Sequence, residues 1–246
     1  MSAPAEWFRD WFGEAYLELY PHRDEEEAAR AVALYGERTG LPAGSRVLDL
    51  ACGAGRHLQR LRAAGLRATG IDLSAPLLRA ARTRPGLAGT LVRADMRALP
   101  FADASFDGLV NFFTSFGYFL TPEEDVAVLG EIRRVLRADA PFLMDYLNAA
   151  WVIDRLDPES VGEINGTPVR QTRWVEGDQV FKRIEIAGRE GQPPEVYHER
   201  VRLYPPETLW QLLRENGLDP IHTFGSYDGA PFGPESPRLL MIGRTL

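Results

Sequence analysis

The stretch from Arg46 to His57 constrains the fold of this chain more than any other. From Arg46 to Ala51 it alternates and then runs apolar with a single acid, and after Cys52 it breaks into Gly53-Ala-Gly55 before a helical pattern. Such a run is typical of a buried parallel strand, and the glycines favour a sharp turn into a helix whose first N–H groups can bind a ligand. The sequence therefore predicts a strand, a glycine turn and a helix start that bind a nucleotide-like ligand.

Two further predicted strands also end beside an acidic residue. The strand 67–71 is followed by Asp72, at the sequence distance where an acid binds the ribose hydroxyls of a nucleotide held over the first turn. The strand 90–93 is followed by Ala94, Asp95 and Met96. Because the carboxyl ends of parallel strands share one edge of a sheet, we expect the two acids to lie near the glycine turn.

Four motifs of this series occur in order along the chain. They read VLDLACGAG at 47–55, GIDLS at 70–74, ADMRALPF at 94–101 and FDGLVN at 106–111. In order and spacing the series, which covers roughly 46–148, resembles the class I S-adenosylmethionine-dependent methyltransferases. The resemblance implies a doubly wound α/β fold: a seven-stranded, mostly parallel sheet ending in an antiparallel hairpin, with helices on both faces. It also implies S-adenosylmethionine as the cofactor.

The resemblance assigns the adenosine part of the cofactor to two strand ends. Asp72 accepts hydrogen bonds from the ribose hydroxyls, and Leu73 covers the face of the adenine ring. Asp95 meets the adenine amino group, and Met96 donates its backbone N–H to the ring.

The methionine part is expected over the glycine turn. Gly53 leaves space for it, and its ammonium group would be held by the Ala51 carbonyl, the Asn111 backbone and, through water, Asp49. The expected cofactor set is completed by Gly55, Arg56 and His57 at the start of the helix and by Tyr20 on the N-terminal helix.

Composition limits the class of partner. The 246 residues carry a net charge of -7 and no basic run, which argues against a nucleic-acid partner. Cys52 is the single cysteine, so no internal disulfide can form, and no His, Cys or carboxylate cluster suggests a metal. No apolar run approaches membrane-spanning length, and acids within the first apolar stretch differ from a signal peptide. A cytoplasmic protein without a membrane partner is expected.

Hydrophobic periodicity divides the chain into four parts. An amphipathic helix is predicted over 4–20, a second helix runs from Asp24 to Gly40, and three alternating stretches at 168–175, 180–187 and 195–204 predict an antiparallel meander. Residues 1–40 form helices that cap the site, and 41–160 form the cofactor-binding core, with further strands at 106–113 and 141–147. Residues 161–204 form the meander. The last part, 205–246, contains a helix and two final strands at 221–227 and 238–244.

The expected reaction is methyl transfer to a nitrogen or oxygen of a small molecule by in-line displacement. This chemistry needs alignment of a nucleophile more than a strong acid, and a base only when the acceptor arrives protonated. The candidates for a catalytic role are Tyr20, Tyr118, Asp145 and Tyr227, and Asn148 and Tyr197 are further candidates for the acceptor pocket.

Two other functions remain open from the sequence. A non-catalytic S-adenosylmethionine-binding regulatory protein would keep the same motifs. An NAD(P)-dependent oxidoreductase shares the first turn and the acid after the second strand, but Leu58 stands where its third glycine belongs. The meander likewise has two uses, as a lid over the acceptor or as a contact between two copies in a homodimer.

Overall fold

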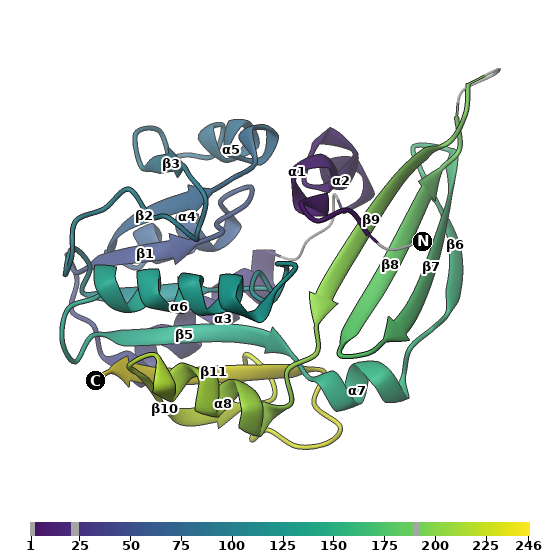
Figure 1. Cartoon of the computed structure of the whole chain (residues 1–246). Coiled ribbons are helices and arrows are strands. Elements are labelled where there is room, and N and C mark those ends of the chain that lie inside the picture. Colours follow the sequence, from purple (N-terminus) through teal and green to yellow (C-terminus); the bar gives the residue numbers. More distant parts are fainter. Residues whose placement is uncertain (1–2, 21–24, 189–191) are drawn as a thin grey trace.

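The strands of this computed structural model, which describes residues 3–20, 25–188 and 192–246, form two separate sheets (Figure 1). The larger sheet has seven strands in the order β10-β11-β5-β4-β1-β2-β3. Its parallel strands are β1 (Arg46–Leu50), β2 (Arg67–Asp72), β3 (Leu91–Arg93), β4 (Gly108–Asn111) and β5 (Pro141–Leu147). An antiparallel hairpin of β10 (Leu218–Phe224) and β11 (Arg238–Thr245) completes it beside β5. The expected doubly wound α/β fold is confirmed.

Each face of this sheet carries its own hydrophobic core, because successive strand residues point to opposite faces. Leu48 and Leu50 face α6 (Pro122–Val135) and α8 (Pro206–Glu215). Val47 faces the opposite core, to which α3 (Glu25–Thr39), α4 (Arg56–Ala63) and α5 (Ala75–Arg82) contribute. In Figure 1, α6 and α8 lie in front of the sheet and α3 lies behind it.

The N-terminal segment differs from the single helix expected over 4–20. It forms two short helices, α1 (Trp7–Trp11) and α2 (Glu14–Leu19), because Gly13 adopts an extended conformation between them. The break leaves the Phe12 carbonyl outside any helix, where it accepts a hydrogen bond from the Ser74 hydroxyl. The predicted helix start at Asp24 lies outside the described residues, and α3 begins at Glu25.

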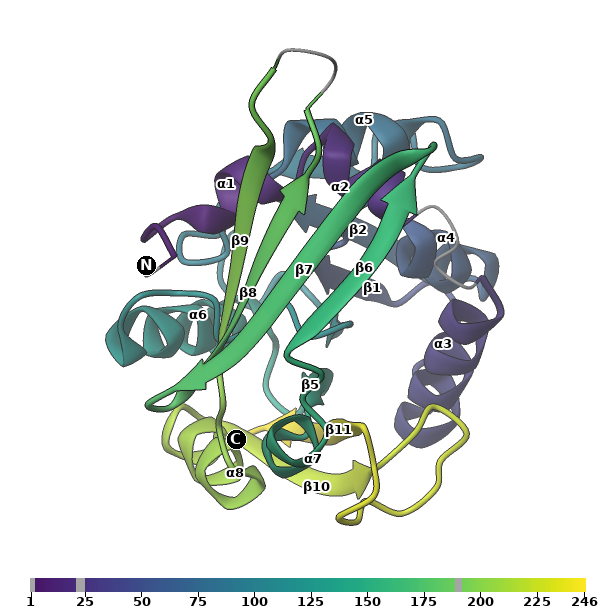
Figure 2. The same ribbon diagram turned by 90° about the vertical axis from the view of Figure 1, so that its right-hand side faces the viewer.

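The second sheet contains four antiparallel strands, one more than the expected meander of three. It consists of β6 (Glu159–Ile164), β7 (Thr167–Glu176), β8 (Gln179–Ile186) and β9 (Glu195–Arg202), and the short helix α7 (Ala149–Asp154) links it to β5. β6 was not predicted because a glycine and two glutamates weaken its alternation. Figure 2 shows this sheet in front of α1 and α2.

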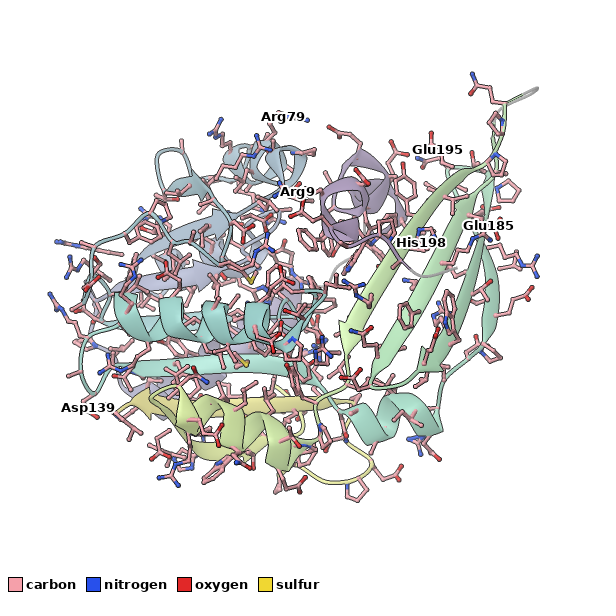
Figure 3. The ribbon with its side chains drawn as sticks, in the orientation of Figure 1. Arg9, Arg79, Asp139, Glu185, Glu195 and His198 are labelled. Carbon is pink, nitrogen blue, oxygen red and sulfur yellow. The ribbon has the colours of Figure 1, made fainter. Side chains whose placement is uncertain are left out.

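The second sheet lies at one end of the molecule, with α1 and α2 between it and the main sheet (Figure 1). In Figure 3, Asp139 lies at the opposite end from the strands that carry Glu185, Glu195 and His198. Within the described ranges no helix has the length and hydropathy needed to cross a membrane.

Candidate functional site

A cavity of about 880 Å³ opens at the carboxyl ends of the central strands. Its floor is formed by the segments after β1, β2, β3 and β4, and residues of α1 and α2 lie over it. The second sheet supplies a further wall through Arg173, Lys182 and Glu199. A volume of this size lies within the range of small-ligand sites, roughly 300–1,000 Å³.

The glycine turn presents bare backbone to the cavity. Gly53 lines it with φ +53°, and a side chain there would meet only Leu77, whose nearest atom is 3.9 Å away. Gly55 is the left-handed N-cap of α4, and a Cβ on it would approach Leu87 to 2.6 Å. Gly53 therefore leaves space for a ligand, while Gly55 does not line the cavity and allows α4 to pack closely.

Asp72 is half-buried at the end of β2 and lines the cavity. Its two carboxylate oxygens accept hydrogen bonds from the backbone N–H groups of Gly53 and Ser74, both at 2.8 Å. Burial raises the pKa of Asp72, and these hydrogen bonds oppose the rise. Since a carboxylate has about four acceptor positions, Asp72 can still accept two hydroxyl groups from a ligand.

Two buried acceptors lie beneath the turn and do not line the cavity. Asp49 is 1% exposed, and burial together with the charge of Asp72 raises its pKa to about 8. Its Oδ2 atom and the Oδ1 atom of Asn111 have no hydrogen-bond partner among the described residues. The Asn111 amide donates to the Leu50 carbonyl at 2.9 Å. Buried acceptors of this kind are normally satisfied, so they fit a ligand ammonium reached directly or through water.

Asp95 lies on the cavity wall together with Leu73 and Met96. Burial favours its neutral form, yet hydrogen bonds from the Arg97 side chain and backbone prevail and lower its pKa. Arg97 contacts the two carboxylate oxygens at 2.7 and 3.1 Å, and its guanidinium lies 4.5 Å from the centre of the Phe119 ring. The acid is therefore held ionised in a fixed orientation, with one acceptor position left for a ligand.

A cationic cluster borders the start of α4. Arg56 and Arg238 line the cavity and share Glu27, at 3.6 and 2.8 Å. Beside them His57 stacks on Phe112 with ring centres 4.3 Å apart. These side chains are suited to a ligand carboxylate, and Arg56 and His57 belong to the expected cofactor set.

Tyr20 and Tyr118 both line the cavity from its helical side. The hydroxyl of Tyr20 lies 2.5 Å from the Nζ atom of Lys182 on β8. Tyr118 stacks on Phe12, and its carbonyl accepts a hydrogen bond from the Trp7 indole at 3.3 Å. The structure therefore brings these two candidates to the same cavity as the cofactor candidates.

The other candidates lie outside the cavity wall. Asp145 is fully buried and accepts hydrogen bonds from the Tyr227 hydroxyl and, at 2.6 Å, from the Phe113 backbone. It thus holds the Phe113 segment in place instead of facing a substrate. Asn148 donates to the Ser236 carbonyl, and the Tyr197 hydroxyl donates to Glu195.

Several polar residues of the cavity wall had no place among the sequence candidates, including Arg173, Lys182, Glu199 and Arg238. The alternation within 181–186 predicts that Lys182 and Phe181 point to opposite faces of a strand. It does not predict which face meets the cavity, because that depends on how the second sheet docks on α1 and α2. The described residues contain no group of three or more His, Cys, Asp or Glu arranged to hold a metal.

Comparisons with known proteins agree with this geometry. The methyltransferase domain family matches residues 47–139, which contain the four strand-end motifs. Residues 47–139 therefore carry a methyltransferase domain, and many structural neighbours of the chain are class I S-adenosylmethionine-dependent methyltransferases. The donor that gives this family its name, S-adenosylmethionine, fits the glycine turn, the accepting face of Asp72 and the two unsatisfied acceptors described above.

One relative is the protein YqeM of Bacillus subtilis, 29% identical over 151 residues, which are 61% of this chain and 59% of that protein. The chain thus spans less than two thirds of this relative. Other relatives are named for acceptors as different as 23S rRNA, malonyl-[acyl-carrier protein] and a dTDP-amino sugar.

Two solved structures share the fold over nearly the whole chain. An S-adenosylmethionine-dependent methyltransferase from Clostridium acetobutylicum has a TM-score of 0.79 and 18% identity, covering 96% of this chain and 98% of its own. The sugar N-methyltransferase KedS8 from Streptoalloteichus has a TM-score of 0.71 and 24% identity, covering 95% and 93%. Both likenesses extend through the second sheet, since they cover more than the methyltransferase domain.

Proposed function

We propose that this chain is a cytoplasmic enzyme that transfers a methyl group from S-adenosylmethionine to a nitrogen or oxygen of a small molecule. The observation that carries the proposal is one shared cavity. It joins the strand-end residues around Asp72 to the polar wall formed by Lys182 and Glu199, and α1 and α2 lie over it. A covered cavity of this size suits a cofactor beside a small acceptor better than a nucleic-acid strand, and the net charge of -7 supports the same choice.

When bound, S-adenosylmethionine supplies an electrophilic methyl group on a sulfonium. In this proposal Asp72 accepts the ribose hydroxyls, Asp95 and Leu73 hold the adenine, and Met96 donates its backbone N–H. Asp49 and Asn111 meet the ammonium group, and the cationic start of α4 meets the carboxylate. The remaining residues align the acceptor and exclude water, which is the main requirement of an in-line displacement.

Tyr20 is the group best placed to orient the acceptor. It lines the cavity, and its hydroxyl accepts a hydrogen bond from the Lys182 ammonium at 2.5 Å, which fixes the direction of the phenol. Tyr118 shares the wall and serves to position the acceptor ring or amine.

The experiment is a transfer assay with S-adenosylmethionine carrying a labelled methyl group. We expect label in a small-molecule fraction of a cell extract, at a rate above that for tRNA, rRNA or protein fractions. Asp72→Ala should lower cofactor affinity at least tenfold in calorimetry, because it removes charge-assisted hydrogen bonds, and should lower transfer with it. Asp154→Ala, at an exposed acid outside the cavity, is the matched control.

Four results would contradict parts of the proposal. Faster methylation of rRNA than of every small-molecule fraction would overturn the acceptor class. Cofactor binding without transfer to any fraction would favour the regulatory protein. Stabilisation by NAD but not by S-adenosylmethionine in a thermal-shift assay would favour the oxidoreductase. An affinity of Asp72→Ala within about threefold of the parent would remove Asp72 from the ribose.

A further inference from the structure

Nearly every charged side chain on the cavity wall is paired with an opposite charge. The pairs are Arg56 and Arg238 with Glu27, Arg84 with Glu25, Lys182 with Glu199, and Asp95 with Arg97. Among the described residues that line the cavity, only Asp72 and Arg173 have no oppositely charged side chain at ion-pair distance. Asp72 already has its proposed role at the ribose, which leaves Arg173 as the one unpaired cation among the described residues of the cavity wall.

Arg173 is held in place by neutral groups only. Its Nη1 atom donates to the Asp157 carbonyl at 3.3 Å and to the Ser160 hydroxyl at 3.0 Å, and Nη2 donates to Gln171 at 2.6 Å. A guanidinium has five N–H donors. One donor on Nε and one on Nη2 therefore remain, and these two nitrogens share an edge of the guanidinium. That edge has the geometry with which arginine binds both oxygens of a carboxylate or phosphate.

The position of Arg173 points to the acceptor and not to the cofactor. Arg173, Lys182 and Glu199 are directly opposite each other on β7, β8 and β9, so they form one row across the second sheet. This wall also contains Val180 and Val201. The cofactor candidates, in contrast, belong to the main sheet and the helices that follow it, apart from Tyr20.

From this arrangement we propose that the methyl acceptor carries an oxyanion, a carboxylate or a phosphate, which Arg173 binds through the unused edge of its guanidinium. The proposal rests on the function proposed above and adds the chemical class of its acceptor. The oxyanion supplies the counter-charge that Arg173 lacks, and two parallel hydrogen bonds fix its orientation. The valines beside the charged row provide contact for an apolar part of the same molecule.

A matched pair of fluorescent compounds tests this idea before the acceptor is known. 8-Anilinonaphthalene-1-sulfonate carries an oxyanion, and N-phenyl-1-naphthylamine has the same ring system without it. With the protein saturated in S-adenosylhomocysteine, we expect Arg173→Gln to weaken binding of the sulfonate roughly tenfold and leave binding of the neutral compound unchanged. Arg173→Lys should retain part of the affinity. Arg170→Gln, at an exposed arginine of the same strand that pairs with Glu159, should change neither.

Competition then separates the two kinds of oxyanion. Benzoate and phenyl phosphate should each displace the sulfonate from the parent protein, and benzyl alcohol should not. The stronger of the two competitors indicates whether the acceptor carries a carboxylate or a phosphate. Equal losses in Arg173→Gln and Arg170→Gln would overturn the proposal. A parallel loss of S-adenosylmethionine affinity in Arg173→Gln would also overturn it, because Arg173 would then serve the cofactor. If neither the parent nor any variant binds S-adenosylmethionine, the proposed function is wrong. The sulfonate measurement still tests whether Arg173 binds an oxyanion.

Discussion

Asp49 shows how a single residue can couple the glycine turn to pH. Its carboxyl lies beneath the turn, close to the charge of Asp72 and without a partner for Oδ2 among the described residues. Burial therefore holds the acid protonated well above its ordinary range, with a pKa of about 8 instead of 3.8. Arg56 and a backbone hydrogen bond from Leu58 oppose this shift only in part.

We expect Asp49→Asn to stabilise the cofactor-free protein more at pH 8 than at pH 4. Below pH 4 both states of the parent keep the proton. Between about 4 and 8 the unfolded chain loses it while the folded chain keeps it, so the parent's free energy of unfolding falls as the pH rises. The slope of this contribution is at most about 1.4 kcal/mol per pH unit.

Urea unfolding at the two pH values measures the difference, with Asp154→Asn as the exposed control. Asn keeps the shape of Asp49 and removes only its titration. A difference between Asp49→Asn and the parent that stays constant from pH 4 to pH 8 would show that Asp49 does not titrate in this window.

At the scale of elements, α1 and α2 depend on the second sheet for their position. The Trp11 indole donates to Glu199 on β9 at 2.6 Å, and Tyr20 contacts Lys182 on β8. Trp11 is completely buried and packs on Tyr197, with ring centres 5.1 Å apart. Two helices too short to be stable alone are thus fixed by aromatic packing and by side-chain hydrogen bonds.

Replacing Trp11 should separate the contribution of aromatic packing from that of the hydrogen bond to Glu199. Trp11→Ala leaves a cavity between α1 and β9 and should lower the free energy of unfolding by about 3–5 kcal/mol. Trp11→Phe keeps most of the packing and loses the hydrogen bond to Glu199, so a loss of roughly 1–3 kcal/mol is expected. Chemical denaturation gives both values. Equal losses in the two variants would mean that packing of the indole contributes little.

Local sequence signals were sufficient to predict most elements of the main sheet. The run at 141–147 became β5, and Ser74 caps α5 by accepting the Leu77 N–H at 3.1 Å, because both depend on neighbouring residues only. The break at Gly13 was not predicted, since the aromatic spacing there suits one helix and only contacts with Ser74 and the second sheet reveal two.

The candidate site likewise has one half that local sequence signals predict and another that depends on long-range contacts. Asp72 and Gly53 stand 19 positions apart within one strand-helix-strand unit, whose handedness and register are general, so their contact was foreseeable. Tyr20 and Lys182 stand 162 positions apart and meet only because the second sheet docks on α2. No periodicity in either segment contains that information.

For the whole molecule, the second sheet forms a wall of the cavity that contains none of the strand-end cofactor candidates. The cofactor candidates surround the ends of β1 to β4, and the second sheet contributes Arg173, Val180, Lys182, Glu199 and Val201 to the opposite wall of the cavity. The chain leaves β5 on the cavity side and returns to α8, so the four strands form a continuous wall outside the main sheet (Figure 2). This arrangement supports the use of the sheet as a lid.

Excising this wall should therefore abolish methyl transfer and spare cofactor binding. Glu159 and His198 lie level on the two edge strands, three strand spacings or about 14 Å apart, so about eight glycine and serine residues can replace 159–198. We expect S-adenosylmethionine affinity within about threefold of the parent, no detectable transfer, and a lower melting temperature because Trp11 loses its contact with Tyr197.

A second variant tests the same idea if the excised protein does not fold. Val201→Arg places a large side chain in the cavity wall and keeps all four strands. Sedimentation of both variants shows whether the second sheet acts as a lid within one chain or as a contact between two copies. A folded excision variant that methylates the acceptor at the parent rate would show that the sheet is no part of the active site.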